Sequence, residues 1–122
     1  KDIITDILRE EMGYNGVVIT DALNMSAVSE YYDSAQAAVM ALKAGADMVL
    51  MPENFLQAYA GVLNAVVDGT ISEERINDSL RRIYDIERLA TKITNNSVNA
   101  RDYIALKNKL TYPKYASQKR WS

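Results

Sequence analysis

Apolar residues recur with helical spacing in several segments and form two short unbroken runs. The first helical pattern covers residues 3–12, and Gly13 follows it where a left-handed C-terminal cap is expected. The two runs, residues 17–21 and 47–51, show no alternation of apolar and polar positions. Consecutive β-branched or apolar residues of this kind indicate strands that are buried on both faces of a parallel sheet.

The segment between the two predicted strands contains one helix. Residues 22–32 are expected to form a loop with room for a helical turn. Asp33 and Gln36 have the spacing of a capping box, which predicts that a helix begins here, and Gly45 marks its end. The expected inner stripe of this helix consists of Ala35, Ala38, Val39 and Leu42.

Two more helices are predicted after the second strand. The first has one apolar face and ends before Gly69. That face consists of Phe55, Leu56, Tyr59, Leu63, Val66 and Val67. The second helix begins at Ser72, a good N-cap, and Ile71 and Ile76 have the spacing of a hydrophobic staple. A further amphipathic helix is predicted over residues 99–110.

The predicted order of elements is α-β-α-β-α-α. A strand, a helix and a parallel strand form a crossover unit of an α/β fold. Two strands alone do not make a stable sheet, because each keeps one unpaired edge. We therefore expect further strands to precede this segment, and we expect the isolated chain to self-associate.

Composition narrows the chemistry available to the chain. Its 122 residues are 48% apolar and 25% charged, as in a globular protein, and no apolar run approaches the roughly 18 residues that a transmembrane helix needs. The chain contains neither Cys nor His, which excludes disulfides, thiolate chemistry and imidazole acid–base catalysis. Catalysis would have to rest on carboxylates, hydroxyls, Lys or Arg, and no metal or cofactor is predicted.

Charge divides the chain near residue 94. Residues 1–93 hold 8 basic and 15 acidic side chains, net −7, whereas residues 94–122 hold 6 basic side chains against Asp102 alone, net +5. A basic tail can bind nucleic acid, but no aromatic stacking pattern or known motif accompanies this one. We therefore predict a folded part over residues 1–93 and a solvated basic extension or linker over 94–122, with no nucleic-acid partner.

Asp21 is the candidate catalytic residue. It ends the first predicted strand, and the carboxyl ends of parallel strands are where α/β proteins bind ligands. A carboxylate at this position can act as a nucleophile, a base, a metal ligand or a phosphoacceptor. It can equally cap the following turn, and position alone does not separate these roles.

Residues 8–25, LREEMGYNGVVITDALNM, resemble the segment of glycoside hydrolase family 3 that carries the catalytic aspartate. The similarity is strongest to the β-N-acetylglucosaminidase branch, in which a Leu and then a Met follow the aspartate at these spacings. The β-glucosidase branch usually has Trp directly after the aspartate, where this chain has Ala22. By this resemblance Asp21 is the nucleophile.

The resemblance continues in collinear order over about residues 5–93, through segments 37–52, 66–76 and 80–83. It implies that the two predicted strands are the seventh and eighth of a (β/α)8 TIM barrel. A complete barrel needs roughly 250 residues, so the chain is expected to be a C-terminal fragment of one.

The resemblance also implies the chemistry. Family 3 enzymes are retaining exo-glycosidases, in which the nucleophile and the acid/base lie about 5–5.5 Å apart. In the N-acetylglucosaminidase branch the acid/base is a His supported by an Asp, both upstream of this segment. The chain has no His, so we predict that it is inactive alone and that the parent protein is the enzyme. Asn24 and Met25 are candidates for the sugar subsite, with capping and core packing as alternatives.

Other interpretations remain. The parent is expected to act on β-linked N-acetylhexosamine in cell-wall or chitin fragments, and a β-glucosidase-type member is the alternative. A receiver-like signalling module is disfavoured, because Met51 stands where its Lys would precede Pro52. A non-catalytic structural fragment is the third possibility. Glu53 is a candidate sugar-binding carboxylate, although a position in the first turn of a helix is expected. The compartment is left open.

Overall fold

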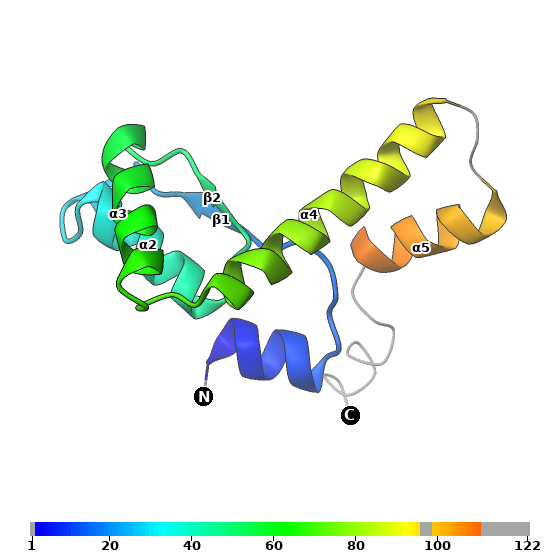
Figure 1. Ribbon diagram of the computed structural model, residues 1–122, viewed down its shortest axis with the longest axis horizontal. Coiled ribbons are helices and arrows are strands. Elements are labelled where there is room, and N and C mark those ends of the chain that lie inside the picture. The colour runs from blue at the N-terminus through cyan, green and yellow to red at the C-terminus, as the bar shows by residue number, and fades with distance from the viewer. Residues whose placement is uncertain (1, 96–98, 111–122) are drawn as a thin grey trace. The chain divides into compact units, whose positions relative to one another are not determined.

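A computed structural model describes residues 2–95 and 99–110 (Figure 1). The elements are η1 (Ile3–Glu11), β1 (Ile19–Ala22), α1 (Ser26–Ser29), α2 (Ser34–Ala44), β2 (Met48–Leu50), α3 (Phe55–Val67), α4 (Glu73–Thr94) and α5 (Ala100–Leu110). The chain divides into two compact units, one of residues Val18–Ser79 and one of Lys1–Val17 together with Leu80–Ser122. The predicted order of helices and strands is confirmed, with the short α1 in the loop after β1.

The Val18–Ser79 unit is built on one parallel pair of strands. β1 pairs with β2, with Ile19 opposite Met48 and Ala22 opposite Leu50. Figure 1 shows α2 and α3 side by side next to this pair. The β1-α2-β2 order is the crossover unit that the sequence predicts.

The predicted capping box of α2 is present. The Gln36 backbone amide donates to Asp33 Oδ1 at 2.7 Å, and the Asp33 amide donates to Gln36 Oε1 at 3.2 Å. Gly45 ends the helix with φ at 113°, a conformation that glycine adopts without steric cost. The buried residues of α2 are Ser34, Ala37, Ala38 and Leu42, close to the predicted stripe.

Small residues allow α2 and α3 to approach closely. A Cβ on Gly61 would lie 2.5 Å from the Ala35 Cβ and 2.9 Å from its Cα, so no larger residue fits without movement. The same unit has a core cluster of three buried side chains, Leu42, Ala65 and Ile71. Ile76 packs against the same core as Ile71, which confirms the predicted hydrophobic staple.

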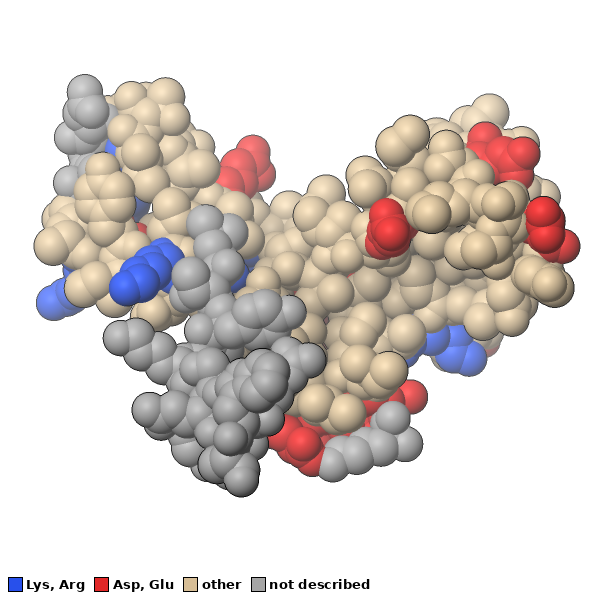
Figure 2. All heavy atoms as spheres, turned by 180° about the vertical axis from the view of Figure 1, so that it is seen from behind, with Lys and Arg blue, Asp and Glu red and all other residues tan. Residues whose placement is uncertain are grey.

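The apolar face that the sequence predicts on α3 is largely not the face that packs. The buried residues of α3 are Ala58 and Ala65, because small side chains fit against the neighbouring helix. The larger apolar side chains remain 52–79% exposed. They are Phe55, Leu56, Tyr59, Leu63 and Val67, here called the α3 apolar surface. The part of the molecule that contains α2 and α3 is at the right of Figure 2. Its charged side chains are few and separated from one another by uncharged surface.

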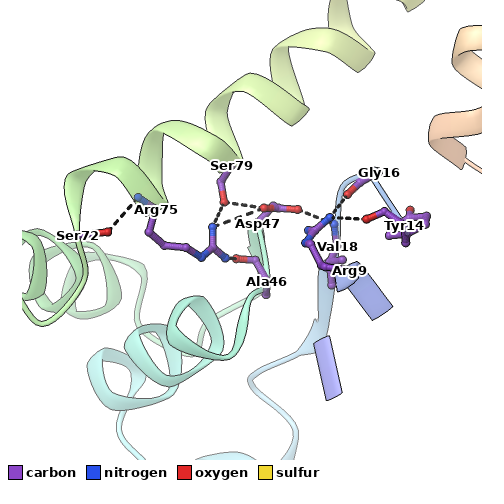
Figure 3. A network of polar contacts seen from close by, with 9 residues as sticks. All are labelled: Arg9, Tyr14, Gly16, Val18, Ala46, Asp47, Ser72, Arg75 and Ser79. Atoms are coloured by element: carbon purple, nitrogen blue, oxygen red, sulfur yellow. Dashed lines mark hydrogen bonds and ion pairs between the residues drawn. The ribbon is translucent and has the colours of Figure 1, made fainter. Parts of the chain in front are cut away.

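The second unit begins with the π-helix η1. Gly13, with φ at 66°, follows it as predicted. The Arg9 guanidinium then binds the connecting segment, donating from Nη1 to the carbonyl oxygens of Tyr14 at 3.2 Å and Gly16 at 2.8 Å (Figure 3). These bonds fix the path of the chain immediately before β1.

Helix α5 confirms the helix predicted over residues 99–110. Asn99 caps it, since the Asp102 amide donates to Asn99 Oδ1 at 3.0 Å and the Asn99 amide donates to Asp102 Oδ2 at 3.3 Å. Two ion pairs join α5 to α4, Lys92 to Asp102 at 3.4 Å and Lys109 to Asp85 at 3.6 Å. Such exposed or half-exposed pairs contribute little stability individually.

The predicted boundary at residue 94 stays a prediction, and most of the basic extension, residues 96–98 and 111–122, lies outside the described residues. Within residues 2–95 and 99–110, no helix has the combination of length and apolar character that a membrane crossing requires.

Candidate active site

Asp21 is exposed and lies one residue before the end of β1. The strand begins at Ile19 and ends at Ala22, whereas the sequence predicted residues 17–21. The Asp21 Oδ1 accepts a hydrogen bond from the Ala22 amide at 2.8 Å. Its Oδ2 accepts none from any residue that the structure describes. One carboxylate oxygen is thus oriented by the backbone, and the side chain is exposed.

The pairing of β1 with β2 is irregular next to Asp21. The register shifts between Ile19 and Ala22, and the Leu50 amide donates to the Thr20 hydroxyl at 2.9 Å. The Leu23 amide then donates to the Leu50 carbonyl at 3.0 Å. Irregularities of this kind turn side chains at the ends of strands, and they occur often beside active sites.

The start of β1 is held by a buried carboxylate (Figure 3). The side chain of Asp47 is fully buried, and its Oδ2 accepts a hydrogen bond from the Val18 amide at 2.9 Å. The Asp47 amide donates in turn to the Val18 carbonyl at 2.8 Å. This double link fixes the position of the strand three residues before Asp21.

The other oxygen of Asp47 binds α4. Its Oδ1 accepts a hydrogen bond from the Ser79 hydroxyl at 2.6 Å and lies 3.7 Å from Arg75 Nη1. Arg75 also donates to the Ser79 hydroxyl and, at 2.6 Å, to the Ala46 carbonyl. A buried charge is tolerated only when it is paired and hydrogen-bonded, and Asp47 meets both conditions.

This network could not be located from the sequence. Asp47 appeared there as the first residue of a strand, and Arg75 as part of a helix start, 28 positions later. The available signal was the charge itself, because an Asp directly before a buried strand needs a partner.

Asn24 and Met25 lie in the turn between β1 and α1, and both are exposed, Met25 by 51%. Met25 also occupies the N-cap position of α1 without a side-chain hydrogen bond. Their role in a sugar subsite stays a prediction. Among the described residues, no group of three or more acidic side chains is arranged to hold a metal ion.

These features define the class of protein: a parallel β-α-β unit with an exposed carboxylate near the carboxyl end of a strand, where α/β proteins bind ligands. Residues 1–86 match the model of the glycosyl hydrolase family 3 N-terminal domain. This match covers well over half of the chain, and the chain belongs to this family. The fold is accordingly part of the family's TIM barrel.

Two relatives illustrate the similarity. Beta-hexosaminidase A of Pseudoalteromonas piscicida is 32% identical over 106 residues, which cover 80% of this chain and 17% of the relative. The structure of a family 3 β-N-acetylglucosaminidase from Paenibacillus sp. str. FPU-7 is 42% identical, covering 77% of this chain and 18% of that one, with a TM-score of 0.62. The chain therefore spans less than a fifth of either relative.

A similarity of a different kind concerns a shorter stretch. The DNA mismatch repair protein MutS of Alkaliphilus metalliredigens is 56% identical over 39 residues, which are 32% of this chain and 4% of that protein. This identity is higher than that of either glycosidase relative. The chain thus carries similarity to two kinds of protein.

Proposed function

We propose that the chain is part of a retaining exo-β-N-acetylglucosaminidase in which Asp21 is the nucleophile. The observation that carries the proposal is the exposed carboxylate of Asp21 at the rim end of β1, in a segment matched to glycosyl hydrolase family 3. The names of the relatives, beta-hexosaminidase and β-N-acetylglucosaminidase, favour N-acetylhexosamine as the sugar.

The first step is attack of Asp21 on the anomeric carbon. The hydrogen bond from the Ala22 amide to Oδ1 supports this role, because it orients the carboxylate and leaves Oδ2 available to form the bond to carbon. The leaving oxygen takes a proton from a general acid, and water then hydrolyses the glycosyl-enzyme with retention.

The acid/base is proposed to lie outside these 122 residues. Retention needs two groups about 5–5.5 Å apart on one rigid scaffold. The chain contains no His, so it cannot supply the imidazole that the resemblance implies. We therefore expect the isolated chain to be inactive and the full-length protein to be an O-glycosyl hydrolase.

The test is to trap the intermediate on the full-length protein. A fluorinated, slowly hydrolysed N-acetylhexosaminide is incubated with the wild type, Asp21→Asn and Asp68→Asn, and the labelled peptide is mapped by mass spectrometry. Asp68→Asn is a matched control, because the Asp68 carboxylate is also exposed and also accepts a hydrogen bond from a nearby backbone amide, that of Thr70.

We expect an adduct on Asp21 in the wild type and in Asp68→Asn, and none in Asp21→Asn. Turnover of an aryl β-glucoside with no turnover of the N-acetylglucosaminide would favour the β-glucosidase-type alternative. No adduct and no turnover of either substrate would reduce the protein to a non-catalytic relative.

The similarity to MutS favours a second candidate function for the C-terminal part, namely nucleic-acid binding. The family match ends at residue 86, so residues 87–122 are the part of the chain that it does not explain. Residues 94–122 carry a net charge of +5, which suits a polyanionic partner. This candidate competes with the expectation that the tail is only a solvated extension.

Fluorescence anisotropy with matched and mismatched DNA duplexes tests the second candidate. We expect binding that weakens steeply with salt and that Arg101→Glu, on exposed α5, reduces several-fold. Lys43→Glu is the control, because it makes the same charge change at an exposed site within the family match. Absence of binding at low salt, or equal effects of the two substitutions, would reject the candidate.

A further inference from the structure

A cavity of about 550 Å³ lies in the Val18–Ser79 unit and does not include Asp21. It is formed by the two loops that leave the carboxyl ends of β1 and β2. The segment from the end of α1 to the start of α2 contributes residues 29–34, and the segment that leads into α3 contributes Glu53, Asn54 and, on the helix itself, Gln57. Both loops belong to the rim at which an α/β barrel binds its substrate.

The lining of this cavity is polar and aromatic. Tyr31 is 75% exposed and Tyr32 43% exposed. Neither tyrosine hydroxyl, nor the carboxylate of Glu30 or Glu53, forms a hydrogen bond or ion pair with any residue in the described part of the chain. Glu53 precedes Asn54, the N-cap of α3, so it is not the first-turn helix residue that the sequence suggested.

The walls of the cavity are held in place from behind. The Asn54 backbone amide donates a hydrogen bond to the Ser34 hydroxyl at 2.9 Å. The Ser34 backbone amide donates one to Gln57 Oε1 at 3.3 Å. Asn54 Oδ1 also accepts a hydrogen bond from the Gln57 amide at 3.0 Å. These bonds tie the start of α2 to the start of α3 and hold this wall of the cavity in place.

The chemistry of the lining selects the ligand. Glu30, Asp33 and Glu53 line the cavity with no Lys or Arg among them, so a phosphate or a nucleic acid would be repelled. The described acidic groups do not form a metal site. Carboxylates accept hydrogen bonds from hydroxyl groups, and side-chain amides both donate and accept them, while aromatic faces pack against the apolar face of a sugar ring. A neutral saccharide satisfies both kinds of contact.

We propose that this cavity binds a sugar unit of the substrate other than the one attacked by Asp21, with Tyr31 as a stacking surface and Glu53 as a hydrogen-bond acceptor. The proposal rests on the proposed glycosidase function and deepens it. The site would make the enzyme prefer an oligosaccharide of N-acetylglucosamine to a substrate with a single sugar.

The experiment compares two substrates on the full-length protein. The values of kcat/KM are measured for the β-1,4-linked trisaccharide of N-acetylglucosamine and for an aryl β-N-acetylglucosaminide. The variants are Tyr31→Ala, Glu53→Gln and their combination. Tyr84→Ala is the control, since Tyr84 is 64% exposed and is not one of the residues that line the cavity.

For the double variant we expect the trisaccharide kcat/KM to fall about tenfold more than that of the aryl substrate, the size of a lost stacking contact. Tyr84→Ala should leave the ratio of the two values unchanged. Equal falls for both substrates, or no fall for the trisaccharide, would overturn the proposal.

Binding separates this proposal from the glycosidase function. Saturation-transfer NMR with the trisaccharide is recorded on wild type and on the double variant. If the wild type hydrolyses neither substrate but binds the trisaccharide, and the double variant does not, the cavity is a saccharide site and the glycosidase proposal fails alone. If the wild type shows no saturation transfer and no preference for the trisaccharide, the cavity proposal is wrong.

Discussion

Asp47 and Val18 bind each other through both backbone and side chain: the Val18 amide donates to Asp47 Oδ2 at 2.9 Å, and the Asp47 amide donates to the Val18 carbonyl at 2.8 Å. The same carboxylate binds Ser79 and pairs with Arg75. The residues directly before the two strands are thereby joined to α4. Asp21 lies three residues further along the strand that this link positions.

Replacing Asp47 by Asn should destabilise the chain by about 3 kcal/mol, because it removes the buried negative charge that pairs with Arg75. Urea denaturation measures the change. Glu74→Gln is the matched control, since Glu74 is exposed on the same helix as Arg75, and it should change stability by less than about 0.5 kcal/mol. Similar effects of the two substitutions would show that the network contributes no specific stability.

The contact between Gly61 and Ala35 leads to a second prediction. In an exposed helix Gly→Ala gains about 1 kcal/mol from helix propensity. At Gly61 the added Cβ would lie 2.5 Å from the Ala35 Cβ and 2.9 Å from its Cα, so the helices must separate, at a cost of about 1–3 kcal/mol. We therefore expect Gly61→Ala to lower the free energy of unfolding.

Asn64→Ala provides the comparison for Gly61→Ala. Asn64 is exposed on the same helix, so its replacement should raise stability slightly through helix propensity alone. Opposite signs for the two substitutions in thermal or urea denaturation would support close packing of α2 on α3. A gain in stability for both would contradict it.

Local patterns in the sequence predicted the helices well, because the groups that start and stop a helix are close in sequence. Asp33 with Gln36, Gly45, and Ile71 with Ile76 all perform the expected roles. The resemblance of residues 5–93 to glycoside hydrolase family 3 predicted both the family and a partial TIM barrel, and the comparisons confirm both. The catalytic role of Asp21 stays a prediction.

Contacts between distant segments were not predicted. The inner side of α3 is set by Ala35 on another helix, and the choice of Ala58 and Ala65 over larger apolar residues follows from that close approach. Likewise, Asp47 contacts Arg75 and Ser79 only in the folded chain, because these residues lie about 30 positions apart in the sequence. The cavity brings together Tyr31 and Glu53, which are 22 positions apart in the sequence.

Asp68 and Thr70 determine a local pH dependence. The Thr70 hydroxyl, and then the Thr70 amide at 2.8 Å, donate hydrogen bonds to Asp68 and lower the pKa of its carboxyl below the ordinary 3.8. Because the folded pKa is the lower one, the stabilising contribution is present above the unfolded pKa and is lost as pH falls through the lowered value.

NMR titration of the Asp68 carboxyl checks this assignment. Thr70→Val removes the hydroxyl and should raise the Asp68 pKa toward 3.8, whereas Thr70→Ser keeps the hydroxyl and should leave the pKa low. If Thr70→Val titrates at the same pH as wild type, the hydroxyl is not the cause.

The α3 apolar surface, whose large side chains are 52–79% exposed, predicts self-association of the 122-residue chain. In the two-stranded sheet, β1 and β2 each have one unpaired edge, which can also pair with another chain. Their side chains Ile19 and Leu50 are 54% and 43% exposed. Replacing both Leu56 and Leu63 by Lys puts two charges into this surface and should shift the chain toward monomer in sedimentation velocity. Asn64→Lys adds a charge to the polar side of α3 and should leave the association unchanged. A wild-type chain that sediments as a monodisperse monomer and binds little hydrophobic dye would contradict the prediction, since that behaviour requires the apolar surface to be covered within one molecule.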